Sequence, residues 1–178
     1  RRVEDFLKRE ARRDLDAAAA RHCASAGARA QSVTLRDTTS RWGSCTAQGA
    51  LNFSWRLIMA PPFVLDYLAA HEVAHLVHHD HSSRFWALTR RLAPLTDRAE
   101  AWLKAHGAHL HRYGAEGGGR ASARDESCDD APAPEIVAAA PVAPVAAADP
   151  VAPLDHVEAL LARARALVEA LDAGRRVA

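Results

Sequence analysis

A change of composition after Tyr113 limits how much of this chain can form a hydrophobic core. From residue 114 the sequence runs GAEGGGRASARDESCDD and continues with alanines, valines and spaced prolines. Such a composition does not form a packed core and is typical of linkers. We therefore expect one folded domain over residues 1–113, followed by a flexible linker over residues 114–153.

Residues 154–174 are predicted to form an amphipathic helix. The apolar residues recur at helical spacing and would share one face, while Gly174 follows as a stop signal; they are Leu154, Val157, Leu160, Leu161, Ala164, Leu167, Val168 and Leu171. An apolar stripe of this kind needs a surface that buries it. We expect this helix either to dock on the domain or to pair with a partner, and to take no part in catalysis.

Charge and cysteine content indicate the cellular compartment in which the protein works. Charged residues make up 25% of the chain, and no apolar run approaches the length of a transmembrane helix. The first twenty residues carry charge throughout and lack the apolar centre of a signal peptide. The three cysteines are far apart in sequence and form neither a C-x-x-C pair nor a disulfide framework. We expect a cytoplasmic protein that does not enter a membrane.

The net charge of +1 conceals an asymmetry between the two parts of the chain. Residues 1–113 hold seventeen Lys and Arg against eleven Asp and Glu, whereas residues 114–178 hold six against eleven. The resulting net charge of +6 on residues 1–113 is small and is typical of solvated helix surfaces. It permits binding of nucleic acid without indicating it.

The order of elements within residues 1–113 indicates an α+β domain. Hydrophobic periodicity predicts a helix over 3–30, two short strands within 32–61 that are joined by a turn at 46–49, and helices over 63–78, 82–92 and 96–111. Gly43 lies between the strand signals and indicates a bulge or bend.

The second of these helices, over 63–78, carries His71 and His75, four residues apart with Glu72 between them. Two imidazoles one helical turn apart project from one face and can meet a single metal ion. Glu72 is placed to take a proton from a metal-bound water rather than to bind the ion. This is the H-E-x-x-H arrangement of zinc hydrolases, in which zinc acidifies the water and the glutamate acts as general base.

A third protein ligand is expected, and His78, His79 and His81 are the candidates. In a continuous helix His78 would lie one further turn along the axis, and three ligands in a column cannot surround an ion tetrahedrally. His81 lies beyond the predicted helix end, where the chain can turn back and present an imidazole from another direction. We therefore predict His71, His75 and His81 as the ligands of Zn²⁺, with His79 and Asp80 at the exposed helix end or as hydrogen-bond partners of ligands.

Two other interpretations of the motif are disfavoured. An H-E-x-x-H sequence occurs by chance in helices, but here an apolar run precedes it and a third histidine and an aromatic pair follow it. The spacing H-E-x-x-H-x5-H equals that of metzincins. A metzincin, however, has Gly where this chain has His78 and a methionine downstream, whereas the one methionine here, Met59, lies upstream.

The chain resembles the YgjP-like family of zinc metallopeptidases, which are relatives of the SprT-like peptidases. The resemblance covers residues 1–113 and is carried, in order, by RWGSC within 40–45, LNFSWRL within 51–61, and the segment LDYLAAHEVAHLVHHDHSSRFW at 65–86. It implies a zincin-like, minigluzincin-like core in which the motif helix packs on a small antiparallel sheet. It also implies His71, His75 and His81 as zinc ligands and Glu72 as the catalytic residue.

We therefore expect a zinc metallopeptidase acting on a peptide or protein substrate. The group that would stabilise the oxyanion is left open among Tyr67, Arg41, His109 and Tyr113, because spacing singles out none of them. Two alternatives remain: a SprT-like peptidase acting on DNA-associated proteins, and a non-catalytic, zinc-stabilised interaction module.

Overall fold

A computed structural model describes residues 2–38 and 40–113, together with Glu158 and Ala162. The predicted linker over 114–153 and the apolar face of the predicted helix over 154–174 lie outside the described residues. Among the helices that the model describes, none is long and apolar enough to cross a membrane.

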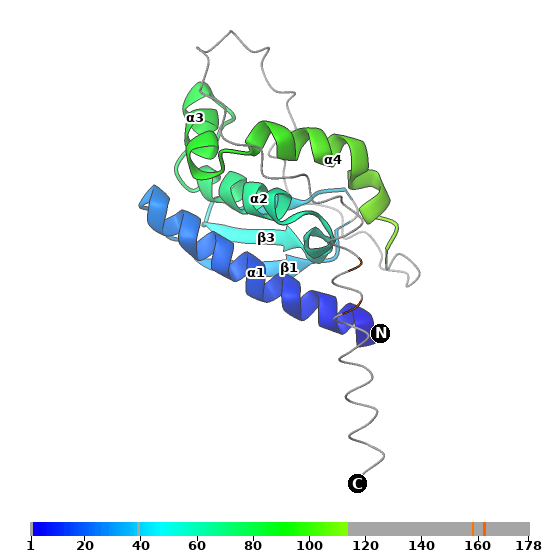
Figure 1. Cartoon of the computed structure of the whole chain (residues 1–178). Coiled ribbons are helices and arrows are strands. Elements are labelled where there is room, and N and C mark those ends of the chain that lie inside the picture. The colour runs from blue at the N-terminus through cyan, green and yellow to red at the C-terminus, as the bar shows by residue number, and fades with distance from the viewer. Residues whose placement is uncertain (1, 39, 114–157, 159–161, 163–178) are drawn as a thin grey trace, which may run out of the picture.

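The described part of the chain has α+β architecture, as predicted, with four α-helices and one small sheet (Figure 1). The elements in order are α1 (Arg2–Ala26), β1 (Ser32–Arg36), β2 (Gly43–Cys45), β3 (Ala50–Ser54), the 3-10 helix η1 (Trp55–Met59), α2 (Pro62–His75), α3 (Ser83–Leu92) and α4 (Thr96–Leu110). Gly27, with φ of 64°, ends α1 earlier than expected, because glycine readily adopts the left-handed conformation that terminates a helix.

The sheet differs from the small antiparallel sheet that we expected. It has three strands in the order β1-β3-β2, with β1 parallel to β3 and β2 antiparallel to β3. The turn at residues 46–49 joins β2 to β3 as a hairpin, and the Gly49 amide donates to the Thr46 carbonyl at 2.8 Å. The chain also reverses between β1 and β2, so two reversals make β1 and β3 run the same way. The prediction of an antiparallel sheet was therefore wrong for this pair of strands.

Helix α2 is the centre of the fold. It lies beside α1, packs against the sheet, and is flanked by α3 and α4 (Figure 1). Ten of its fourteen residues are buried, which follows from its sequence, because a helix that is apolar on all sides must be enclosed. Glu72 and His75, which are both buried on α2, are therefore held in a largely dry environment.

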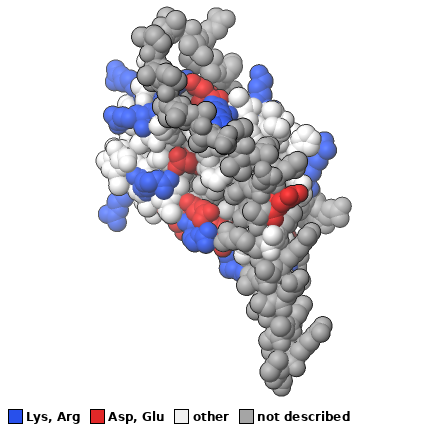
Figure 2. Space-filling model, in the orientation of Figure 1, with Lys and Arg blue, Asp and Glu red and all other residues white. Residues whose placement is uncertain are grey.

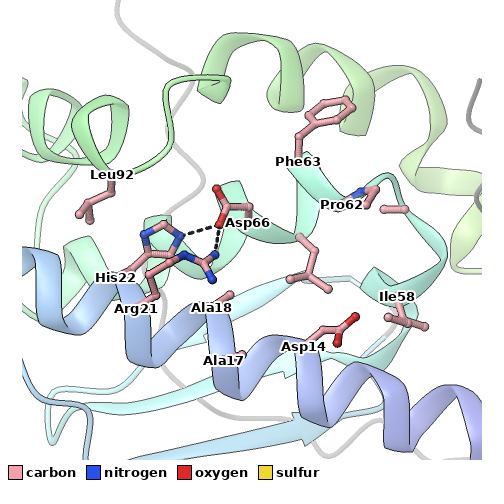
Figure 3. A pocket seen from close by; sticks show the side chains of 12 residues that line it. Asp14, Ala17, Ala18, Arg21, His22, Ile58, Pro62, Phe63, Asp66 and Leu92 are labelled. Carbon is pink, nitrogen blue, oxygen red and sulfur yellow. Dashed lines mark hydrogen bonds and ion pairs between the residues drawn. The ribbon is translucent and has the colours of Figure 1, made fainter. Parts of the chain in front are cut away.

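A partly buried polar contact joins α1 to α2 (Figure 3). Asp66 Oδ1 of α2 lies 2.8 Å from His22 Nε2 and 2.5 Å from an Arg21 guanidinium nitrogen, both on α1. The three residues line a groove of about 580 Å³ between these helices, and His71, His75 and His81 are not among its lining residues. Burial alone would raise the pKa of Asp66, but hydrogen bonds and charge from His22 and Arg21 outweigh it and lower that pKa.

Replacing Asp66 by alanine is expected to destabilise the fold by about 1–3 kcal/mol, the usual cost of leaving a buried polar partner unsatisfied. His22, which is only 3% exposed, would lose its hydrogen-bond partner. Because the folded-state pKa of Asp66 is lowered, its charged form stabilises the protein above its ordinary pKa. That contribution is lost as the pH falls through the lower, folded-state value.

The measurement is urea unfolding of wild type and Asp66→Ala between neutral pH and about pH 3, spanning the ordinary Asp pKa. The difference in unfolding free energy should be full at neutral pH and should shrink on acidification below about pH 4. A difference that stays constant over this range would contradict the assignment.

Charged side chains on the described surface are mostly dispersed. On the face shown in Figure 2, several Lys and Arg side chains lie along one side with uncharged surface between them. Others form ion pairs, such as Arg90 with Asp97 at 3.1 Å and Arg21 with Asp66.

Candidate metal centre

Three histidines converge at the end of α2. His71, His75 and His81 form a group whose potential ligand nitrogens all lie within 4.8 Å of one another. The Nε2 atoms of His71 and His81 are 3.3 Å apart. Two nitrogens bound at 2.0–2.1 Å to one tetrahedral zinc ion are separated by about 3.3 Å. The three predicted ligands therefore come together at a spacing that fits a metal ion.

The chain turns immediately after His75, which brings His81 back to α2. The amides of Val77 and His78 both donate to the Ala74 carbonyl, at 3.0 and 2.9 Å, and close this turn. We expected the helix to continue to His78, and this was wrong. His78 is thus not the next residue along a helical column, as the prediction assumed.

His78 instead contributes its backbone to the site. Its carbonyl oxygen lies 3.2 Å from His75 Nδ1. A carbonyl can only accept, so Nδ1 of His75 carries the proton and its Nε2 keeps a free lone pair. Such a hydrogen bond fixes the tautomer of a metal-binding histidine.

Phe85 and Trp86 of α3 pack against the histidines. The Phe85 ring is fully buried, and its centroid lies 4.8, 4.4 and 4.8 Å from those of His71, His75 and His81. The Trp86 ring stacks on His81 at 5.8 Å. These aromatic side chains restrict the imidazoles and keep bulk water away from one side of the group.

The same burial keeps two of the histidines neutral. Desolvation, with the neighbouring imidazoles adding to it, lowers the pKa of His71 to about 3. Desolvation and the charge of His81 likewise lower the pKa of His75 to about 4. At neutral pH both side chains are neutral imidazoles, which is the form that binds a metal.

Glu72 reaches from α2 to the start of β2. Its side chain is 5% exposed and lies so close to Gly43 that a Cβ added there would be 2.8 Å from the Glu72 Cδ atom. Burial raises the pKa of the Glu72 carboxyl to about 8 when no ion is present. A cation bound to the adjacent histidines would favour the carboxylate and lower this pKa.

The four candidates for stabilising the oxyanion lie in different environments. The Tyr67 side chain is 4% exposed, and its hydroxyl contacts both His71 and Glu100. Arg41 and His109 are exposed. Tyr113 is 55% exposed, and its carbonyl accepts a hydrogen bond from Arg56 at 2.8 Å.

Sequence reasoning did not include Glu100 in the site. It lies on α4 and meets the site through the packing of α4 on α2, for which the local sequence gives no signal. Tyr67 does carry a signal, because Tyr67, His71 and His75 follow one another at intervals of four residues and so share one helix face.

Comparison with protein-family models matches residues 1–106 to the family described as YgjP-like, metallopeptidase domain. Comparisons with curated proteins and with solved structures gave no significant match. The matched segment spans more than half of the chain and contains the three histidines and Glu72. The chain therefore belongs to the YgjP-like metallopeptidase family.

Proposed function

We propose that this protein is a zinc-dependent peptidase in which His71, His75 and His81 hold the ion and Glu72 is the general base. The single observation that carries the proposal is the convergence of the three histidine nitrogens within 4.8 Å, next to a buried glutamate. When bound, zinc supplies a Lewis acid that polarises a carbonyl and acidifies a water molecule. The imidazole ligand set suits zinc among the biological metals.

Glu72 would move the proton in this reaction. Its carboxylate takes a proton from the attacking water and delivers it to the leaving nitrogen as the peptide bond breaks. Since Glu72 lies against β2 within a closely packed domain, its carboxylate has little room to move. A base held in place in this way needs little reorganisation during the reaction.

The position of β2 supports a peptide as the substrate. β2 is an outer strand of the three-stranded sheet, and Gly43 at its start contacts Glu72. An outer strand can pair with an extended peptide through backbone hydrogen bonds. A peptide aligned on β2 would therefore pass the general base. We place this activity in the cytoplasm.

The experiment is a peptide-library digestion by purified protein whose metal content has been measured. Zinc-loaded protein should cleave, chelated protein should not, and added zinc should restore cleavage. Parallel digestions of DNA-bound and free proteins test the alternative of a SprT-like activity. Cleavage that survives complete removal of metal would contradict the proposal.

Gly43→Ala is expected to lower kcat for peptide cleavage by about 100-fold, since a displacement near 1 Å at a reacting group can cost that much. An alanine Cβ would lie 2.8 Å from Glu72 Cδ, closer than real Cβ contacts, so the glutamate or β2 must move. Zinc binding should be unchanged because the three histidines lie elsewhere. Steady-state kinetics and metal analysis of the same sample check both statements.

Ser44→Ala is the matched control for this substitution. It adds no atom, and it removes only a hydroxyl that accepts from Asn52 Nδ2 at 3.3 Å in the same sheet. It should cleave at close to the wild-type rate. If both variants lose activity equally, the effect belongs to β2 in general and not to the contact between Gly43 and Glu72.

A further inference from the structure

The hydroxyl of Tyr67 links the metal centre to helix α4. It donates a hydrogen bond to Glu100 Oε1 at 3.0 Å, and the same oxygen lies 3.3 Å from His71 Nδ1. The Tyr67 side chain is buried, and Glu100 is half-buried on α4. This chain of contacts runs from a carboxylate, through a phenol, to an imidazole of the proposed ligand set.

Counting protons along these contacts, with Glu100 as the accepting carboxylate, assigns a tautomer to His71. A phenol has one proton, and the Tyr67 proton is directed to Glu100. Toward His71 the Tyr67 oxygen must then accept, so His71 carries its proton on Nδ1. The lone pair is left on Nε2, the atom that lies 3.3 Å from Nε2 of His81.

His75 reaches the same state in a different way. Its Nδ1 donates to the His78 carbonyl, which is a backbone group and needs no particular side chain. His71 has no such turn after it, because it lies in the interior of α2. The hydrogen-bond partner of its Nδ1 is the hydroxyl of Tyr67, four residues earlier on the same helix face. Glu100 of α4 orients that hydroxyl by accepting a hydrogen bond from it.

We propose that Tyr67 and Glu100 are positioning residues that hold His71 in the Nδ1-protonated tautomer, with Nε2 directed toward His75 and His81. The inference rests on the proposed metal site, since it assigns these residues to the preparation of His71 as a ligand. Glu100 acts only through Tyr67. Without the carboxylate, the phenol proton is free to turn toward Nδ1 and to favour the opposite tautomer, in which Nε2 carries the proton.

The first test measures zinc affinity by competition with a chromophoric chelator, in the absence of any substrate. Tyr67→Phe should weaken binding by about 10–100-fold, the usual loss when the hydrogen-bond partner of a metal-binding histidine is removed. Glu100→Ala should also weaken it, whereas Glu100→Gln should stay close to wild type, because its amide oxygen still accepts from the phenol.

Asp97→Ala is the matched control on the same helix. Asp97 lies three residues before Glu100 and pairs with Arg90 on the surface. Its loss should leave zinc affinity unchanged. A double variant, Tyr67→Phe with Glu100→Ala, should bind zinc no more weakly than Tyr67→Phe alone, because Glu100 has no route to His71 without the phenol.

The second test observes the tautomer directly in metal-free wild-type protein. Long-range ¹H–¹⁵N NMR spectra at neutral pH distinguish a protonated Nδ1 from a protonated Nε2. We expect His71 to show Nδ1–H in wild type and a shift toward Nε2–H in Glu100→Ala. A wild-type His71 with its proton on Nε2 would overturn the inference, as would unchanged zinc affinity in Tyr67→Phe.

These outcomes are separate from those of the proposed peptidase activity. If the variants rank in zinc affinity as expected but the wild type cleaves no peptide, the inference stands and the proposed function fails. If wild type cleaves peptides normally but Tyr67→Phe and Glu100→Ala bind zinc as tightly as wild type, the inference fails and the proposed function stands. The wild-type NMR measurement needs no substitution, so it decides the tautomer even if a variant fails to fold.

Discussion

Glu72→Gln is expected to lower kcat for peptide cleavage by about 10²–10⁴-fold, the range attributed to a general base. The amide has nearly the shape of the carboxyl and fits the same space against Gly43, but it cannot accept a proton from water. Zinc should remain bound, because the three histidines are intact. Kinetics on zinc-loaded protein and metal analysis of the same preparation give both values.

The same variant should fold normally. In metal-free protein, burial raises the pKa of Glu72 to about 8, so near neutral pH the buried group is already largely uncharged. An uncharged amide in its place should leave the thermal unfolding of metal-free protein little changed. Asp5→Asn, at an exposed position of α1, is the control for a general effect of removing a carboxylate. Wild-type rates in Glu72→Gln would show that another group is the base.

A zinc-binding protein that cleaves nothing, with or without Glu72, would instead support the alternative of an interaction module. In that case zinc bound to the three histidines would have a structural role, linking α2 to the segment before α3. The effect of Glu72→Gln is therefore interpreted only beside the peptide-library digestion of wild type.

His81→Ala is expected to weaken zinc binding by more than about 100-fold, since losing only an outer partner of a ligand already costs 10–100-fold. Two imidazoles on one helix face would remain, and this is too few protein ligands for a catalytic zinc site. His81 is the proposed ligand that lies outside α2. Competition with a chelator of known affinity measures the loss.

His78→Ala is the matched control and tests a specific feature of the turn. The contribution of His78 seen in the structure is a backbone carbonyl that accepts from His75, and alanine keeps that carbonyl. Zinc affinity should therefore stay near wild type. If His78→Ala loses the metal while His81→Ala keeps it, the third ligand has been assigned to the wrong histidine.

The sequence predicted those parts of the fold that have a local signal. The apolar run before His71 predicted a buried helix, and α2 is enclosed on nearly all sides. The spacing of His71, His75 and His81 predicted which imidazoles would meet. Both predictions depend on the geometry of a single helix and one turn, which neighbouring residues determine.

The sheet was harder to predict because its middle strand in sequence is short. β2 has three residues, Gly43–Cys45, and shows no alternation of apolar and polar side chains. Because β2 was not predicted, one reversal of the chain was not counted, and β1 and β3 were expected to be antiparallel. The sequence predicted a bulge or bend at Gly43, and the structure shows another constraint there, the close approach of Glu72.

Contacts between distant elements could not be predicted from local patterns. Glu100 meets Tyr67 only because α4 packs on α2, and the two residues are 33 positions apart. The end of α2 at His75 was also missed, because the following residues Leu76-Val77-His78 extend the helical pattern. Tertiary packing overrides that pattern and forms the turn on which the return of His81 depends.

The most direct measurement of the central claim is anomalous diffraction at the zinc edge from crystals of zinc-loaded protein. The structure predicts one peak at about 2.0–2.1 Å from a nitrogen of each of His71, His75 and His81, the usual zinc–imidazole distance. Glu72 should face the remaining open position. A peak bound to His78 or His79 in place of His81, or no peak at this group, would contradict the account.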